Sequence, residues 1–194
     1  MAADAGGGER MAERMAERMA ERMAERMGKA EGRSLLDRMI DRMTVQRDAL
    51  AWAERAVAGR NGMVLEVGLG KGRTFDHLRH LFPPRDILVF DMWVRVPPEL
   101  TPDEDRLFVG DFQQTMPAAA ERFGRCARLA HADFGSTDRN HDAEQAAWLA
   151  PLIDALMLPG GVVLSDRPLR RPNWTPLDLP ADDRWPYHAW RVEA

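Results

Sequence analysis

The sequence predicts an α/β fold, a doubly wound, mostly parallel sheet of about six to seven strands with helices on both faces. Short apolar segments alternate with helical patterns five times along the chain. Each segment is a continuous apolar run rather than an alternation of apolar and polar residues, which is typical of strands covered on both faces. The predicted strands are 63–67, 87–90, 107–109, 127–132 and 162–164.

A helix is expected before the first of these strands. Ser34 is a suitable N-cap, and the apolar residues after it approximate one face of a helix that ends near Gly59. That face could cover the sheet of its own chain or pack against a second copy in a homodimer. Its members are Leu35, Leu36, Met39, Ile40, Met43, Leu50, Ala53 and Val57.

The remaining elements follow in order. Helices are predicted over 73–81, 113–123 and 141–157, and the turn Pro159-Gly160-Gly161 leads into the fifth strand. The region after this strand is rich in Pro, Trp and Arg. It is expected to hold the last strands, one of them within 187–192, after a long irregular loop.

Residues 1–32 differ from the rest of the chain. The tetrapeptide Met-Ala-Glu-Arg starts at Met11 and is repeated from Met15, Met19 and Met23. These residues favour helix, but a four-residue period drifts by roughly 40° per repeat and makes a poor coiled-coil seam. We therefore expect 1–32 to be a low-complexity extension, flexible or an isolated helix, and 33–194 to be one folded domain.

Composition narrows the class of protein. The chain has 194 residues, with 27 Lys and Arg, 31 Asp and Glu, and a net charge of −4. This balance argues against binding of nucleic acid through bulk charge. The single cysteine, Cys126, excludes a disulfide framework. No apolar run reaches the roughly 20 residues that cross a bilayer, so we expect a cytoplasmic protein with no membrane partner.

Acidic residues close the predicted strands. In a doubly wound sheet, ligands bind outside the carboxyl ends of the strands, so acids repeated at these ends indicate a binding site. An additional acid lies within the first strand, just before a glycine cluster. These residues are Glu66, Asp91, Asp111, Asp133 and Asp166.

The glycine cluster has the spacing E-x-G-x-G-x-G, made by Glu66, Gly68, Gly70 and Gly72. A dinucleotide-binding loop instead needs G-x-G-x-x-G, and Arg73 occupies the position of its third glycine. The motif resembles the first motif of class I S-adenosylmethionine-dependent methyltransferases, especially short single-domain bacterial members, which share a Rossmann-like fold. A nicotinamide-dependent oxidoreductase and a non-catalytic S-adenosylmethionine-binding module are the alternatives.

This resemblance implies roles for individual residues. Asp91 would hold the two ribose hydroxyls, because a carboxylate can accept two hydrogen bonds from a cis-diol. Asp111 would meet the adenine amino group, and Met92 and Phe112 would flank the adenine ring. The cofactor-binding residues implied in this way are Glu66, Gly68, Gly70, Gly72, Asp91, Met92, Asp111 and Phe112.

The end of the fourth strand is the predicted wall of the reaction site. His131 and Asp133 lie on one face of that strand, and they are the candidate catalytic residues, with His131 as a general base. Asp133 and Asp166 resemble the acids of metal-dependent O-methyltransferases. Arg167 follows the second acid where those enzymes have an asparagine, which argues against a metal. The expected methyl acceptor is a small molecule.

Overall fold

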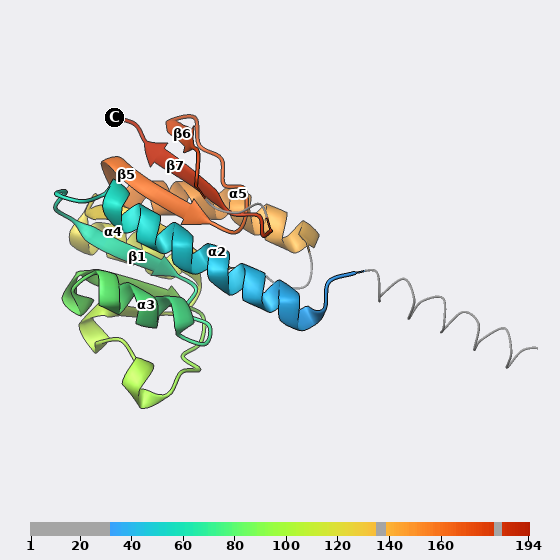
Figure 1. Cartoon of the computed structure of the whole chain (residues 1–194). Helices are drawn as coiled ribbons and strands as arrows, with labels where there is room; N and C mark the ends of the chain where they lie inside the picture. Colours follow the sequence, from blue (N-terminus) through green and yellow to red (C-terminus); the bar gives the residue numbers. More distant parts are fainter. Residues whose placement is uncertain (1–31, 135–138, 181–183) are drawn as a thin grey trace, which may run out of the picture. The chain divides into compact units, whose positions relative to one another are not determined.

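The computed structural model describes residues 32–134, 139–180 and 184–194 (Figure 1). All but the last residue of the predicted extension 1–32 lies outside the described residues. The chain divides into residues 1–41 and 42–194. Helix α2 (Leu35–Ala56) begins in the first unit and continues into the second. The sheet and the site belong to the second unit.

A seven-stranded sheet organises the second unit, which confirms the predicted fold class. The strand order is β3-β2-β1-β4-β5-β7-β6. The first five strands in this order are parallel, β7 is antiparallel to β5, and β6 is antiparallel to β7. The strands are β1 (Met63–Val67), β2 (Ile87–Asp91), β3 (Leu107–Val109), β4 (Ala127–Ala132), β5 (Met157–Ser165), β6 (Trp174–Leu177) and β7 (His188–Val192).

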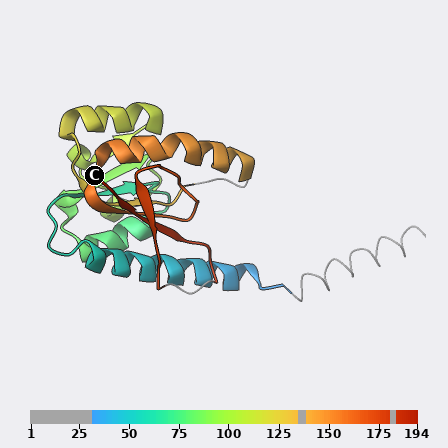
Figure 2. The same cartoon turned by 90° about the horizontal axis from the view of Figure 1, so that it is seen from above.

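Helices cover both faces of this sheet (Figure 2). Residues 42–56 of α2 and helix α3 (Arg73–Leu81) pack on one face, and α4 (Phe112–Phe123) and α5 (Arg139–Leu156) pack on the other. Three short 3₁₀ helices lie in the loops between α3 and β3, at Pro84–Asp86, Pro98–Leu100 and Glu104–Arg106.

Two features of the C-terminal half differ from the predictions. Strand β5 begins at Met157, five residues before the predicted start, because Met157 already pairs with Ala127 of β4. The register then shifts before Val162 pairs with Leu129. Gly160, with a φ of 76°, lies in this irregular stretch. Strand β6 replaces part of the loop predicted before residue 187. It contains Pro176, which has no backbone N–H to donate. An edge strand tolerates proline because its outer side has no neighbouring strand to pair with.

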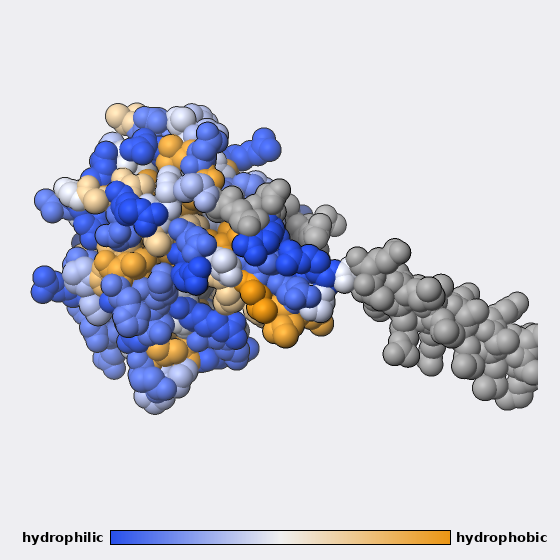
Figure 3. Space-filling view, in the orientation of Figure 1, coloured by the Kyte–Doolittle hydropathy of each residue, from blue (hydrophilic) through white to orange (hydrophobic). Residues whose placement is uncertain are grey.

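The predicted apolar face of α2 is buried in one part only. Leu50, Ala53 and Val57 are buried, whereas the side chains nearest the N-terminus of the helix are exposed, namely Leu35, Leu36, Met39 and Ile40. The face of the molecule seen in Figure 3 is mostly hydrophilic, with apolar residues in small patches. Among the described helices, none is long and apolar enough to cross a membrane. A homodimer stays a prediction.

The order of the strands determines where a ligand can bind. From β1 the chain first builds outward through β2 and β3, and then returns to place β4 on the other side of β1. The connections on the two sides diverge at this switch point, so they leave a crevice outside the carboxyl ends of β1 and β4.

Candidate functional site

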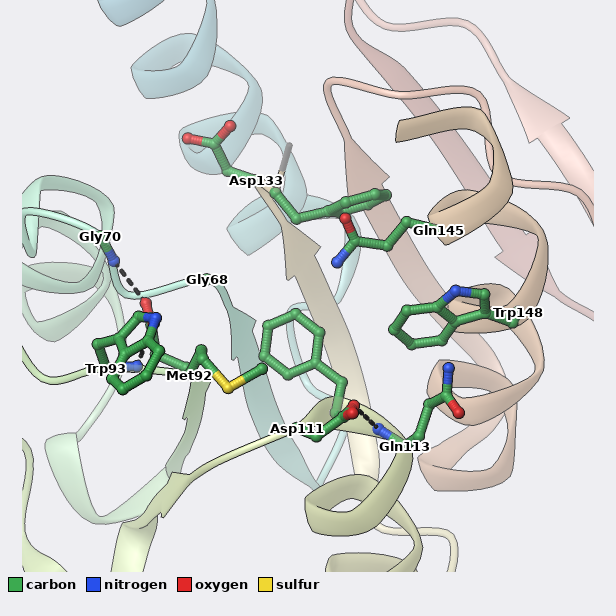
Figure 4. A pocket seen from close by; sticks show the side chains of 12 residues that line it. Gly68, Gly70, Met92, Trp93, Asp111, Gln113, Asp133, Gln145 and Trp148 are labelled. Atoms are coloured by element: carbon green, nitrogen blue, oxygen red, sulfur yellow. Dashed lines mark hydrogen bonds between the residues drawn. The ribbon is translucent and has the colours of Figure 1, made fainter. Parts of the chain in front are cut away.

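A pocket of about 680 Å³ opens at the carboxyl ends of β1, β2 and β4 (Figure 4). Three carboxylates line it, and none of the described lining residues is Lys or Arg. Large apolar and amide side chains form the rest of the wall. The lining residues are Gly68, Gly70, Asp91, Met92, Trp93, Asp111, Phe112, Gln113, Asp133, Phe134, Gln145 and Trp148.

The glycine loop lies between β1 and α3. Gly68 has a φ of 101°, and a Cβ at this position would lie 2.4 Å from the carbonyl oxygen of Asp133, so a side chain is excluded. A Cβ on Gly70 would have no heavy atom within 4 Å, because this residue faces open space in the pocket. Gly72 does not line the pocket. It precedes α3, with a φ of 77°.

Asp91 ends β2 beside this loop. Its Oδ2 accepts a hydrogen bond from the Gly70 amide at 2.8 Å, and its Oδ1 accepts one from the Trp93 amide at 2.9 Å (Figure 4). A carboxylate oxygen can accept two hydrogen bonds, so each oxygen keeps capacity for a ligand. The two amides fix the direction in which the carboxylate points.

Asp111 is the N-cap of α4. Its Oδ1 accepts a hydrogen bond from the Gln113 amide at 2.8 Å, as expected for an aspartate at a helix start. Phe112 and Met92 line the same pocket. The structure therefore brings together the three residues that the sequence analysis placed around an adenine ring.

Asp133 lines the pocket where β4 ends. Its Oδ1 pairs with Arg42 Nη2 at 2.5 Å, and its Oδ2 accepts a hydrogen bond from Gln46 Nε2 at 2.6 Å. Arg42 and Gln46 are four residues apart on α2, so both side chains lie on one face of the helix. Together they hold the carboxylate at the pocket wall.

Glu66 and His131 lie beneath the pocket rather than in its lining. Both are completely buried, and His131 Nδ1 lies 2.6 Å from Glu66 Oε2, while Nε2 meets the Tyr187 hydroxyl. Burial by itself lowers the pKa of His131, but the charge and hydrogen bond of Glu66 outweigh it, so this pKa lies above its usual value. The geometry does not favour the predicted role of His131 as the base that touches the acceptor.

Asp166 follows β5 and is also buried. Arg167 donates a hydrogen bond to its Oδ2 at 3.1 Å, and its Oδ1 lacks a hydrogen-bond partner among the described residues. Burial, reinforced by the charge of Asp133, raises the pKa of Asp166 to about 7. Within the described part of the chain, no group of three or more His, Cys, Asp or Glu residues is arranged to hold a metal ion.

Some pocket residues were outside the predicted cofactor set. Trp93 and Gln113 directly follow predicted residues, and Phe134 follows Asp133, so chain proximity was a usable signal. Gln145 and Trp148 come from α5. Their i, i+3 spacing puts both on one helix face, but only the packing of α5 against the sheet shows that this face meets the pocket.

Known proteins match this chain in family and in fold. Residues 33–185 match the family model of S-adenosyl-L-methionine methyltransferases. The chain is 39% identical to the S-adenosyl-L-methionine methyl transferase of Silicibacter pomeroyi, whose crystal structure matches with a TM-score of 0.77 over 82% of this chain and 99% of that one. No curated protein matches the sequence significantly.

More distant solved structures share the fold. The 1,6-didemethyltoxoflavin-N1-methyltransferase of Burkholderia thailandensis, solved with S-adenosylhomocysteine, is 18% identical, with a TM-score of 0.52 over 100% of this chain and 93% of that one. The putative methyltransferase yhhF of Escherichia coli is 12% identical, with a TM-score of 0.53 over 78% and 87% of the two chains.

The fold, together with the family match and the relative at 39% identity, defines an S-adenosylmethionine-dependent methyltransferase. The chain belongs to the S-adenosyl-L-methionine methyltransferase family, and its methyl donor is S-adenosyl-L-methionine. This confirms the predicted cofactor and decides against a nicotinamide-dependent oxidoreductase.

Proposed function

We propose that the protein transfers the methyl group of S-adenosylmethionine to a small-molecule acceptor that binds in the same pocket. The observation that carries this proposal is the lining itself, in which three carboxylates and two residues of the glycine loop occur together and none of the described lining residues is cationic. S-adenosylmethionine carries a positive amine and a positive sulfonium, and an acidic wall attracts both charges.

The described residues fit the cofactor. Asp91, oriented by two backbone amides, offers both oxygens to the ribose hydroxyls. Asp111, Met92 and Phe112 are suited to the adenine ring, and the open space at Gly70 lets the backbone approach the ligand. When bound, the cofactor supplies an electrophilic methyl group on its sulfonium.

Three of the residues that remain in the lining are suited to hold the acceptor. Phe134, Gln145 and Trp148 provide apolar surface and an amide. The volume of the pocket, about 680 Å³, lies within the range of roughly 300–1,000 Å³ that is usual for small-molecule sites. Methyl transfer from a sulfonium is an in-line displacement, so holding the acceptor in line supplies much of the acceleration.

Asp133 is the proposed catalytic residue. Because Arg42 and Gln46 fix its carboxylate at the pocket wall, it can accept a hydrogen bond from an O–H or N–H of the acceptor and orient that atom toward the methyl group. Neither nucleic acid nor a metal ion is part of this proposal. The acidic lining disfavours a phosphate backbone, and Arg42 and Arg167 neutralise the two candidate metal ligands, Asp133 and Asp166.

Calorimetric titration with S-adenosylhomocysteine tests the cofactor site. The variant Asp91→Asn keeps the size of the side chain but loses its charge and one acceptor, so we expect the Kd to rise by roughly ten- to a hundredfold. Glu121→Gln, an exposed position on α4, is the matched control and should bind like the wild type. Equal binding by Asp91→Asn and the wild type would remove the ribose assignment.

The acceptor class is tested by transfer of a labelled methyl group. We expect label to enter a low-molecular-weight fraction of a bacterial extract in the presence of the wild-type protein, and Asp133→Asn to reduce the rate while leaving the Kd for S-adenosylhomocysteine almost unchanged. Label found only in protein or nucleic acid would overturn the small-molecule acceptor.

A further inference from the structure

The two buried residues beneath the pocket form part of a longer hydrogen-bonded series. Glu66 accepts a hydrogen bond from the Thr74 hydroxyl through one oxygen and meets His131 through the other, and His131 meets Tyr187. The series is therefore Thr74–Glu66–His131–Tyr187. It joins α3, β1, β4 and the segment that leads into β7.

The register of the sheet makes this series possible. Glu66 and His131 are directly paired positions on the neighbouring strands β1 and β4, so their side chains leave the same face of the sheet side by side. The rings of His131 and Tyr187 are stacked, with centroids 6.2 Å apart and planes inclined by 24°. Strand pairing therefore positions Glu66 beside His131, and ring stacking positions Tyr187 against His131.

The chemistry of the three groups fixes most of the hydrogen positions. An ionised carboxylate only accepts hydrogen bonds, so His131 Nδ1 donates to Glu66. The other ring nitrogen then either accepts from the Tyr187 hydroxyl, when the imidazole is neutral, or donates to its oxygen, when the imidazole is protonated. In both states the two ring nitrogens are satisfied, which a buried polar ring requires.

Glu66 connects this hydrogen-bonded series to the glycine loop of the pocket. Glu66 lies just before the glycine loop and Thr74 just after it, so one carboxylate ties the two ends of the loop together. The loop between them contains Gly68 and Gly70, which line the pocket. Without His131, the second oxygen of Glu66 would be buried without a hydrogen-bond partner, which is costly and favours a rotation of the carboxylate toward another donor.

We propose that His131 and Tyr187 are positioning residues for the cofactor, because they hold Glu66 in the orientation that shapes the glycine loop. This inference rests on the proposed assignment of the pocket to the cofactor. It gives His131 a role that needs no contact with the acceptor. It also makes the C-terminal segment around Tyr187 a determinant of cofactor affinity, although this segment lies far from the loop in the sequence.

The test is the Kd for S-adenosylhomocysteine, measured by calorimetry alongside urea unfolding of the same variants. We expect His131→Leu to raise the Kd by about tenfold, the loss of one charge-assisted hydrogen bond. His131→Asn should recover part of the affinity, because its amide nitrogen replaces the Nδ1 donor. Tyr187→Phe, which removes only a hydroxyl, should raise the Kd by a smaller factor.

A control separates positioning from general stability. Trp174→Phe removes a buried hydrogen bond to Asp154 away from the loop, so it should lower stability without changing the Kd. Amide exchange in the glycine loop should become faster in the His131 and Tyr187 variants but not in Trp174→Phe. If His131→Leu does not fold, His131→Asn and Tyr187→Phe decide the question.

Two results have distinct meanings. Folded His131 and Tyr187 variants that bind S-adenosylhomocysteine as tightly as the wild type would overturn the positioning role alone. Failure of the wild type to bind would overturn the proposed function, and this inference with it.

Discussion

The two ends of the parallel sheet each bury an aspartate in a different way. Asp154 lies near the amino ends of β4 and β5, and Asp166 follows the carboxyl end of β5. Their exposed fractions are nearly the same, 5% and 4%. Burial raises the pKa of both carboxyls, yet the net result is a lowered pKa for Asp154 and a pKa of about 7 for Asp166.

The difference lies in the donors around each carboxylate. Asp154 accepts hydrogen bonds from Trp174 Nε1 at 2.7 Å and Asn173 Nδ2 at 3.0 Å, and it pairs with Arg125 and Arg171 at 3.5 Å each. Burial raises its pKa, but these donors and charges outweigh that effect. The carboxylate therefore has partners on both of its oxygens.

Asp166 has fewer compensating contacts. Arg167 reaches one oxygen, the other lacks a hydrogen-bond partner among the described residues, and Asp133 adds a like charge. Acids with strongly shifted pKa values are more frequent at functional sites than elsewhere in a protein. The amino end of this sheet therefore surrounds its aspartate with four donors, whereas the carboxyl end leaves Asp166 partly unpaired near the charge of Asp133, which lines the pocket.

The largest expected loss of stability comes from removing the Asp154 carboxylate at the amino end of the sheet. Asp154→Ala leaves the buried donor on Trp174 and the half-buried donor on Asn173 without their acceptor, so we expect a loss of about 3 kcal/mol in the free energy of unfolding. Urea unfolding at pH 7 measures it. Asp105→Ala, at an exposed aspartate, is the control. A loss below about 1 kcal/mol would show that this cluster does little for stability.

A smaller effect of opposite sign is expected at the carboxyl end. The unfolded chain releases the Asp166 proton near pH 3.9, whereas the folded protein keeps it up to about pH 7. Between these values the folded state binds more protons, so this group's contribution to stability falls as pH rises. We expect the stabilisation by Asp166→Asn to be on the order of 2 to 3 kcal/mol larger at pH 8 than at pH 5.

The pH dependence also separates the two acids. Because the folded pKa of Asp154 is below its unfolded value, its contribution is present above about pH 4 and is lost as pH falls further. Thermal unfolding of the two variants between pH 3 and pH 8 should therefore show opposite trends relative to the wild type. Parallel trends would contradict the comparison.

The smallest effect is expected from Arg42. This cation pairs with Asp133 and lowers the pKa of Asp166 in part, but its side chain is one third exposed, at 33%. Arg42→Gln should reduce stability by at most about 1 kcal/mol. It should also move the Asp166 transition to higher pH, which the same unfolding series measures. Gln46→Leu, which removes a neutral donor, should leave that transition nearer its original pH.

Local patterns in the sequence were sufficient to predict the central strands of the sheet. The strands β1 to β4 were predicted within one residue because continuous apolar runs, bounded by glycine or acids, are local signals. The glycine spacing identified the cofactor, and six of the eight predicted cofactor residues line the pocket. The other two, Glu66 and Gly72, lie just outside its lining. Their roles remain predictions.

Only the tertiary structure decided the contacts between distant segments. The pairing of Glu66 with His131, the approach of Tyr187 to that pair, and the arrival of Trp148 at the pocket depend on which strands and helices become neighbours. The antiparallel strand β6 also escaped prediction, because an edge strand has little apolar pattern of its own. The sequence by itself determined the class of sheet, the cofactor and the acids at the strand ends, since these depend on local patterns. Packing decided which acids are held for stability and which are left for a ligand, because partners far apart in the chain set the charge and hydrogen bonding around each one.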